Sequence, residues 1–312
     1  MGGAGHRVDV IIPTRNRPQL TAEAVDAVRA QTFTDWHLWV VDDASDDDTP
    51  THLARHVAGD PRVTILHRTE HGGANPARQT ALAASGAPLV ATCDSDDLWE
   101  PSKLALQVAA WDAEAARAGQ VGPVLCWHDA IDAGGTRRGQ VLRPRRSRRW
   151  HPFTLYNTST PLLSRALLLE VGGFAPVEPY RLRTTDHLDL FLRLTSGHDI
   201  VVVPEVLVHC RHHDGSRNSD GERTLEAAEE AEALLHRVDA DLAARRPATR
   251  AWLHAAVAGR YLELGDRRRA AGFAATALRA GGPGTTAAIL AHYGPWALRR
   301  QVAGLTGRDS KP

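Results

Sequence analysis

The first 120 or so residues alternate between short β-branched runs and amphipathic segments, and this alternation limits the fold more than any other feature. Strand-like runs are expected at 8–13, 37–41, 62–67 and 88–93. Each run is followed by a helical pattern, at 18–31, 53–57, 72–86 and 101–119. Strands joined by helices form right-handed βαβ units. The sequence therefore predicts an α/β fold, with a mostly parallel sheet and helices on both faces.

The alternation is less regular in the following hundred residues, although strands and helices are still expected. The expected elements are a strand at 124–132, a hairpin or loop after it, helices at 164–174 and 186–198, and two short strands around Pro204. Turn residues then fill 215–222, and the remaining pattern is almost wholly helical and rich in Ala and Arg. We therefore expect a first domain at 1–221 and a helical region at 222–312, in which 251–281 resembles one tetratricopeptide-like hairpin.

Composition excludes several classes of protein. The 312 residues include 37 Lys+Arg and 37 Asp+Glu, so net charge gives no attraction to nucleic acid or to a membrane. Three distant cysteines, Cys93, Cys126 and Cys210, argue against a disulfide framework or a zinc site. No run approaches the roughly 20 apolar residues of a membrane span, and no signal-peptide pattern is present. We expect a cytoplasmic protein, and the basic block at 143–150 leaves peripheral membrane contact open.

Polar residues gather where the predicted strands end. The segment 13–17 follows the first strand, Asp42 and Asp43 follow the second, and the Asp-Ser-Asp segment 94–96 follows the fourth. Ligands of parallel sheets bind beyond the carboxyl ends of the strands, so these groups are expected at one edge. Clustered carboxylates repel one another, so the cluster either faces water or has positive charge among it. Two carboxylates two residues apart suit a hard divalent cation, although an isolated Asp-x-Asp is more often a solvated turn.

Five motifs in order resemble those of the inverting glycosyltransferases of family 2, which have the GT-A fold. They include "WVVDDASDDDT" and "CDSDDLWEP" and occupy 8–49, 72–101, 157–174, 186–194 and 201–216. The resemblance implies transfer of a sugar from a nucleotide-diphosphate donor, expected to be uridine-linked, to an acceptor hydroxyl with inversion. The implied role is polysaccharide or glycoconjugate synthesis. The acceptor would be a glycan, a lipid-linked glycan or a small molecule.

The resemblance also assigns residues to the donor and to a metal. The implied donor-binding residues are Pro13, Thr14, Arg17, Asp42, Asp43, Arg78, Asp94 and Ser95. A divalent metal, Mn²⁺ or Mg²⁺, would be bound by Asp96, with Asp94 and His213 as further ligands. Such a metal neutralises the departing diphosphate. Structural roles stay open for some of these positions: Asp42 bracing its turn with Ser45, Arg78 in a surface salt bridge, and Asp97 capping the next turn.

An inverting transferase needs a base that takes the proton of the acceptor hydroxyl. The resemblance places this base at the start of the helix that ends in Leu-Arg-Leu. Aligned back from Arg193 without a gap, His187 occupies the position of the base, and with one inserted residue Asp186 does. A helix start favours an anion, and the ordinary pKa of histidine also suits a base near neutrality. We prefer Asp186 and expect Asp189 to be structural.

Two other functions compete with sugar transfer. A nucleotidyltransferase of the same sheet topology would need a glycine-rich loop after the first strand, but residues 13–20 contain no glycine. A non-catalytic protein that binds a sugar or a partner is the second alternative. The departure from the family pattern at 185–189 keeps this alternative open.

Overall fold

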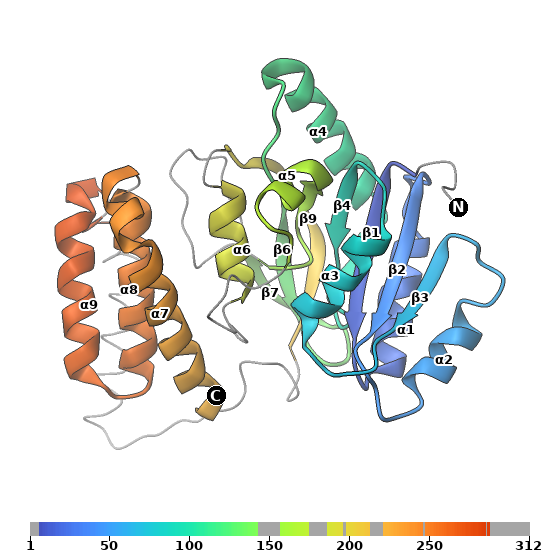
Figure 1. The fold of residues 1–312 in the computed structure, drawn as a ribbon, viewed down its shortest axis with the longest axis horizontal. Helices are drawn as coiled ribbons and strands as arrows, with labels where there is room; N and C mark the ends of the chain where they lie inside the picture. Colours follow the sequence, from blue (N-terminus) through green and yellow to red (C-terminus); the bar gives the residue numbers. More distant parts are fainter. Residues whose placement is uncertain are drawn as a thin grey trace. The chain divides into compact units, whose positions relative to one another are not determined.

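The structure is a computed structural model, and it describes residues 6–142, 157–174, 186–195, 198–212, 221–245, 247–284 and 286–287. The chain forms two compact units, one with the described residues up to 212 and the other with those from 221 onward. Figure 1 shows that the first unit contains strands and helices and that the second contains helices. The basic block at 143–150 and His213 lie outside the described residues.

The predicted alternation in the first 120 residues is confirmed. Its elements are β1 (Val8–Thr14), α1 (Pro18–Arg29), β2 (Trp36–Asp42), α2 (Thr49–His56), β3 (Val63–His67), α3 (Ala74–Ala84), β4 (Leu89–Thr92) and α4 (Lys103–Ala118). Helices α1 and α2 have a proline in the first turn. Backbone N–H groups in that turn have no partner within the helix, so proline costs no hydrogen bond there.

Strands β3, β2, β1 and β4 lie side by side in this order and run parallel. Thr14 at the end of β1 is in register with Asp42 at the end of β2. Ile11 of β1 is in register with Thr92 at the end of β4. The loops that follow β1, β2 and β4 therefore leave the sheet at the same edge.

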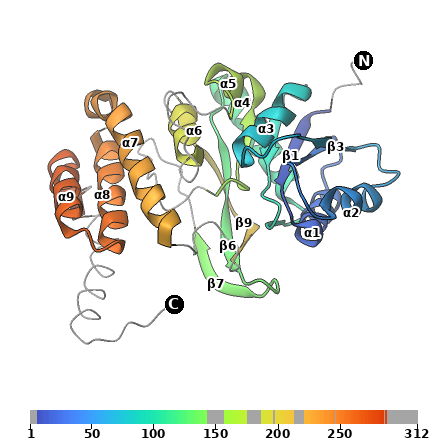
Figure 2. The same ribbon diagram turned by 60° about the horizontal axis from the view of Figure 1, so that its bottom comes forward.

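Beyond β4 the sheet becomes mixed, because hairpins and short strands replace the helical crossovers. β8 (Leu162–Ser164) pairs antiparallel with β4 and with β6 (Val124–Ile131). β6 forms an antiparallel hairpin with β7 (Arg137–Leu142), which Figure 2 shows. A single strand, β9 (Val201–Arg211), replaces the two strands expected around Pro204, since a register shift against β6 accommodates the proline. The sequence predicts neither β8 nor β5 (Leu98–Trp99), which pairs with β9 and is too short for a periodic pattern.

Apolar layers cover both faces of the sheet. One face packs against α1, α2 and α4, and the other packs against α3, α5 (Arg165–Glu170) and α6 (Asp186–Thr195). Figure 1 shows α3 lying across β1. β1 supplies Val10 to the first layer and Ile11 to the second, because strand side chains alternate. All three cysteines are buried and free, as expected.

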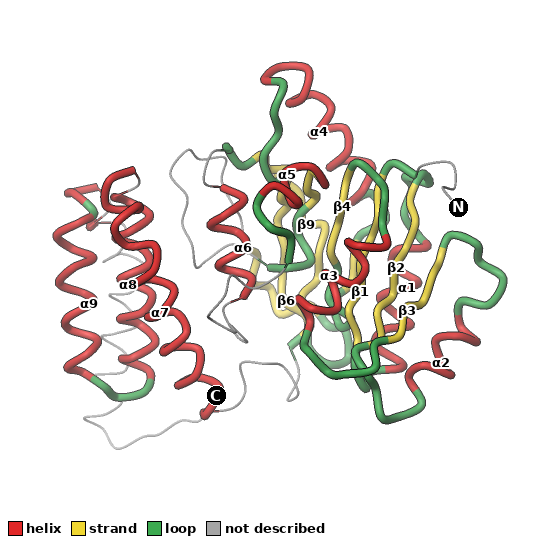
Figure 3. The backbone as a smooth tube through the Cα atoms, viewed as in Figure 1, coloured by secondary structure: helices red, strands yellow, loops and turns green. Residues whose placement is uncertain are grey.

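The second unit consists of α7 (Gly221–Arg245), α8 (Pro247–Glu263) and α9 (Arg267–Ala280), which Figure 3 colours as helix. The turn between α8 and α9 falls at Gly265 and Asp266, and the Asp266 side chain caps α9 by accepting the Arg269 N–H (3.0 Å). Alanines pack between these two helices. The tetratricopeptide-like character of the hairpin at 251–281 stays a prediction. Within the described ranges, no helix has the length and apolarity needed to span a membrane.

Candidate active site

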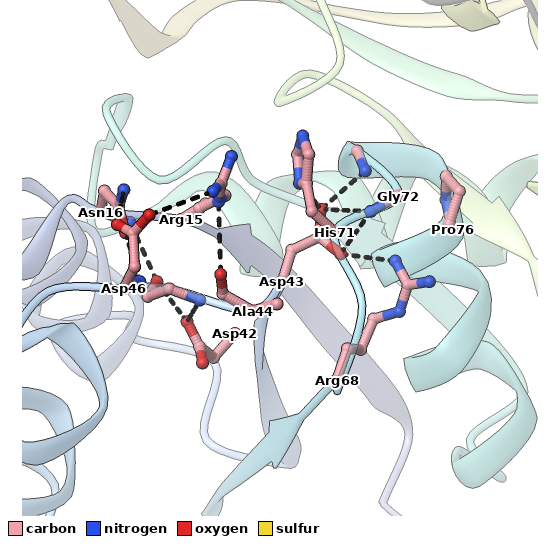
Figure 4. Close-up of polar contacts among 12 residues, drawn as sticks. Arg15, Asn16, Asp42, Asp43, Ala44, Asp46, Arg68, His71, Gly72 and Pro76 are labelled. Carbon is pink, nitrogen blue, oxygen red and sulfur yellow. Dashed lines mark hydrogen bonds and ion pairs between the residues drawn. The ribbon is translucent and has the colours of Figure 1, made fainter.

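The loops that follow β1 and β2 are joined by hydrogen bonds (Figure 4). Asn16 Nδ2 donates to Asp46 Oδ1 (2.5 Å), and the Asp46 N–H donates to Asn16 Oδ1 (3.0 Å). The Asn16 N–H also donates to Ser45 Oγ (2.9 Å). Asn16 and Ala44 have φ values of 53° and 57°, a left-handed conformation that Asn tolerates better than Ala does. The first loop, which leads to Arg17, is therefore held against the second.

Asp43 lies among hydrogen-bond donors from the loop after β3 (Figure 4). Its side chain, 3% exposed, accepts from Arg68 Nη1 (2.5 Å) and from the N–H groups of Gly72 (3.2 Å) and Gly73 (2.6 Å). His71 Nδ1 lies 2.8 Å from the same carboxylate. A carboxylate has about four acceptor sites, so these donors satisfy Asp43 within the protein. Arg68 and His71 were not predicted from the sequence, although basic residues in the loop after a strand could have signalled them.

The other residues assigned to the donor in these two loops have structural partners. Asp42 accepts from Ser45 Oγ (2.5 Å) and from the Ser45 N–H (3.3 Å), so it braces its turn. Pro13 and Thr14 are buried at the end of β1. The Thr14 carbonyl accepts the Asp43 N–H (2.8 Å), which links the ends of β1 and β2.

The acidic loop after β4 is balanced by arginines from other elements. Arg78 of α3 donates to Asp94 Oδ1 (2.5 Å), and Arg17, at the start of α1, donates to Asp96 Oδ2 (2.7 Å). Arg78 is 2% exposed, so the surface salt bridge considered above is wrong. Ser95, between the two aspartates, is buried. Positive charge therefore lies among the carboxylates, which was one of the two alternatives that their repulsion predicts.

A hydroxyl-rich segment, 157–160, holds the same loop. Thr158 Oγ1 donates to Asp94 Oδ2, and Ser159 Oγ donates to Asp97 Oδ2 (2.6 Å). The Arg211 N–H of β9 donates to Asp97 Oδ1 (3.0 Å), so the expected turn cap at Asp97 is wrong. Burial, together with the charges of Asp94 and Asp96, raises the pKa of the Asp97 carboxyl well above its usual range. Adjacent polar side chains just before β8 could have signalled this contact.

The predicted metal ligands have suitable chemistry but unequal surroundings. Both oxygens of Asp94 accept hydrogen bonds, from Arg78 and from Thr158. The side chain of Asp94 is 28% exposed and that of Asp96 is 14% exposed, but their partners differ the other way: Arg78 is 2% exposed and Arg17 is 29% exposed. The partly exposed Arg17 is the easier partner to replace, so Asp96 is the easier of the two to offer to a hard cation. Among the side chains that the structure describes, no three of His, Cys, Asp and Glu are grouped to hold a metal ion.

Helix α6 begins at Asp186, one of the two base candidates. The side chains of Asp186 and His187 lie outside those described. Arg193, in the last turn of the helix, donates to Asp189 Oδ2 (2.9 Å) and to the Gly173 carbonyl (3.0 Å). Asp189 is 2% exposed, so its surroundings agree with a structural role.

A close turn at 172–174 lies between α6 and α3. Gln79 Oε1 accepts the Phe174 N–H (2.9 Å), and a Cβ added to Gly173 would lie 2.5 Å from that oxygen. Gly173 also has a φ of 69°, a backbone conformation that favours glycine. Because Arg78, next to Gln79 in α3, binds Asp94, α3 connects the acidic loop to the turn at 172–174.

The model of "Glycosyl transferase family 2" matches residues 9–166, just over half of the 312 residues. The chain belongs to glycosyltransferase family 2. This membership decides against the nucleotidyltransferase that shares the sheet topology.

Two curated relatives resemble part of the chain. Escherichia coli WfgD, "UDP-Glc:alpha-D-GlcNAc-diphosphoundecaprenol beta-1,3-glucosyltransferase", is 33% identical over 102 residues, which cover 33% of this chain and 40% of WfgD. Bacillus subtilis TuaG, a putative teichuronic acid biosynthesis glycosyltransferase, is 35% identical over 101 residues, which cover 32% and 40%. The alignments therefore span less than half of either relative.

Solved structures share the fold. The mannosyltransferase PcManGT from Pyrobaculum calidifontis, in complex with GDP-Man and Mn²⁺, has a TM-score of 0.57 at 23% identity, over 95% of this chain and 81% of that one. S. aureus TarS 1-349, in complex with UDP-GlcNAc, has a TM-score of 0.58 at 14% identity, over 86% and 91%. The expected GT-A fold is confirmed.

Proposed function

We propose that this chain transfers a sugar from a nucleotide-diphosphate donor to an acceptor hydroxyl, in the synthesis of a polysaccharide or another glycoconjugate. Family membership and the names of the relatives support this function. The observation that carries it is the position of two acidic loops, at 42–48 and 94–97, at the carboxyl edge of the parallel strands, where ligands of such sheets bind.

The donor in this proposal is a UDP-sugar. WfgD is named for UDP-Glc and TarS was solved with UDP-GlcNAc, whereas PcManGT was solved with GDP-Man. A thermal-shift screen of the full chain against UDP- and GDP-sugars, each with and without Mn²⁺, tests the choice. We expect UDP-sugars with Mn²⁺ to raise the melting temperature most, and a larger shift with GDP-sugars would contradict the uridine assignment.

A divalent metal, when bound, would offset the charge of the departing diphosphate. Asp96 is the residue that we propose holds it. Arg78 and Thr158 fix the carboxylate of Asp94, which then faces the ribose or a water of the metal. Arg17 supplies a further positive charge at the same edge.

The base in this proposal is Asp186, with His187 as the alternative. Losing a general base costs about 10²- to 10⁴-fold in rate. Asp186→Asn and His187→Gln separate the two candidates, because the variant that keeps full turnover has not lost the base. The anomeric configuration of the product, measured by NMR, tests inversion, and retention would contradict it.

The acceptor is proposed to be a hydroxyl of a growing glycan, a lipid-linked glycan or a small molecule. A lipid-linked acceptor would bring the chain to a membrane surface. The decisive assay incubates the chain with the UDP-sugar selected by the thermal-shift screen and with one acceptor of each class, and then detects the product by mass spectrometry. No transfer to any class, with donor binding intact, would favour the non-catalytic alternative.

A further inference from the structure

Arginines from three elements contact the acidic loop after β4. Arg78 pairs with Asp94, Arg17 pairs with Asp96, and the guanidinium of Arg211 donates to the Asp96 carbonyl (3.0 Å). The repulsion among the closely spaced carboxylates is therefore offset by the protein itself.

These arginines differ in how easily they can leave the loop. The side chains of Arg78 and Arg211 are 2% and 4% exposed. The side chain of Arg17 is 29% exposed. An ion pair that water reaches is exchanged at lower free-energy cost than a buried one.

The backbone of Arg17 is fixed although its side chain is partly exposed. The Arg17 N–H donates to Thr49 Oγ1 (3.1 Å), and the Arg17 carbonyl accepts from Thr21 Oγ1 (2.6 Å) and from the Thr21 N–H (3.0 Å). Rotation of the side chain away from Asp96 therefore leaves the loop and the start of α1 in place.

We propose that Arg17 is a resident counter-ion of Asp96, which a divalent cation displaces when the nucleotide diphosphate binds. The inference rests on the proposed function, and it adds that the binding of the metal and the binding of the nucleotide are coupled. A guanidinium and a divalent cation repel each other and compete for one carboxylate. The diphosphate offers Arg17 a bidentate partner, so metal and nucleotide each raise the affinity for the other.

Removing the charge of Arg17 therefore strengthens Mn²⁺ binding in the absence of nucleotide. If Arg17 is paired with Asp96 about nine-tenths of the time, only about one-tenth of the wild-type molecules have an Asp96 carboxylate ready to bind Mn²⁺. In Arg17→Ala all of them do, so the Kd of Mn²⁺ falls about tenfold. In the same variant, UDP is expected to enhance Mn²⁺ binding less than it does in the wild type.

The test titrates the full chain with Mn²⁺ alone and measures free Mn²⁺ by electron paramagnetic resonance. Arg17→Ala is expected to bind Mn²⁺ about tenfold more tightly than the wild type. Arg17→Gln is expected to gain several-fold, whereas Arg17→Lys keeps the charge and binds as the wild type does. Adding Asp96→Asn to Arg17→Ala is expected to remove the gain.

Melting temperatures establish which variants are folded, and Arg17→Gln preserves the test if Arg17→Ala unfolds. Unchanged Mn²⁺ affinity in a folded, uncharged variant overturns the proposal, as does a gain that survives Asp96→Asn. Sugar transfer by the wild type is measured separately. If the wild type transfers sugar but the Arg17 variants do not bind Mn²⁺ more tightly, only the counter-ion role is wrong. If the variants bind Mn²⁺ more tightly but the wild type transfers no sugar, only the proposed function is wrong.

Discussion

Asp43 and Asp96 follow strands on either side of β1, at the same edge of the sheet, yet their surroundings differ. The side chain of Asp43 is 3% exposed and accepts from two backbone N–H groups as well as from Arg68. The side chain of Asp96 is 14% exposed and is paired with the more exposed Arg17. Fixed backbone donors make Asp43 part of the scaffold, whereas Asp96 has a partner that can be exchanged.

Similar acidic stretches therefore differ in role according to the donors that the rest of the chain supplies. The loop after β3 encloses Asp43, so that carboxylate contributes to folding. Asp96 meets a side chain that water reaches, so its charge remains usable for binding. Four substitutions test this contrast.

The largest effect is expected at Asp96, on activity. Asp96→Asn should lower Mn²⁺-dependent sugar transfer by at least about 100-fold, because charge stabilisation at the diphosphate is lost. The melting temperature should change by no more than about 2 °C, since the pair with Arg17 is partly exposed. Asp112→Asn, at a 46% exposed carboxylate on α4, is the matched control and should keep full activity. Normal transfer by Asp96→Asn would end its assignment to the metal.

At Asp43 the expected effect is on stability. Asp43→Asn removes the charge that Arg68, Gly72 and Gly73 surround, so it should cost about 2–3 kcal/mol of the free energy of unfolding. Denaturant unfolding followed by tryptophan fluorescence measures this loss. Asp26→Asn, which changes a surface ion pair, should cost less than about 1 kcal/mol. An equal loss in both variants would mean that Asp43 contributes no more to stability than an exposed carboxylate does.

The sheet edge could be predicted from the sequence, but the partners at that edge could not. Each strand and helix of the parallel half carries a local periodic pattern, and parallel strands place Asp43 and Asp96 at a common edge. Arg17 is 79 residues from Asp96 in the sequence, and Thr158 is 64 residues from Asp94. No local pattern encodes such contacts, since they depend on how loops pack after the sheet has formed.

An intermediate effect is expected at Thr158, which holds the acidic loop without being acidic itself. Thr158→Val keeps the shape of the side chain but removes the donor to Asp94, so kcat/KM should fall about tenfold, which is about 1.4 kcal/mol. Thr158→Ser restores the hydroxyl and should recover most of the loss. Thr80→Val removes a hydroxyl that binds only the Pro76 carbonyl of its own helix in the described contacts, and should have little effect. A loss in Thr158→Ser as large as that in Thr158→Val would show that the hydroxyl alone does not account for the role of Thr158.

The smallest effect is expected at Ala44, between the Asp43 scaffold and the loop that leads to Arg17. Its φ of 57° is unfavourable for a residue with a Cβ by about 1 kcal/mol or more, and Gly removes this strain. Gly also increases the entropy of the unfolded chain, which offsets about 0.4–1 kcal/mol. Ala44→Gly should therefore change the free energy of unfolding by between about 0 and +1 kcal/mol. Ala109→Gly, at an exposed position inside α4, should instead cost about 1 kcal/mol. An equal cost at both positions would mean that the backbone of Ala44 is not left-handed. The loops after β1 and β2 would then have to hold Arg17 beside Asp96 by other contacts.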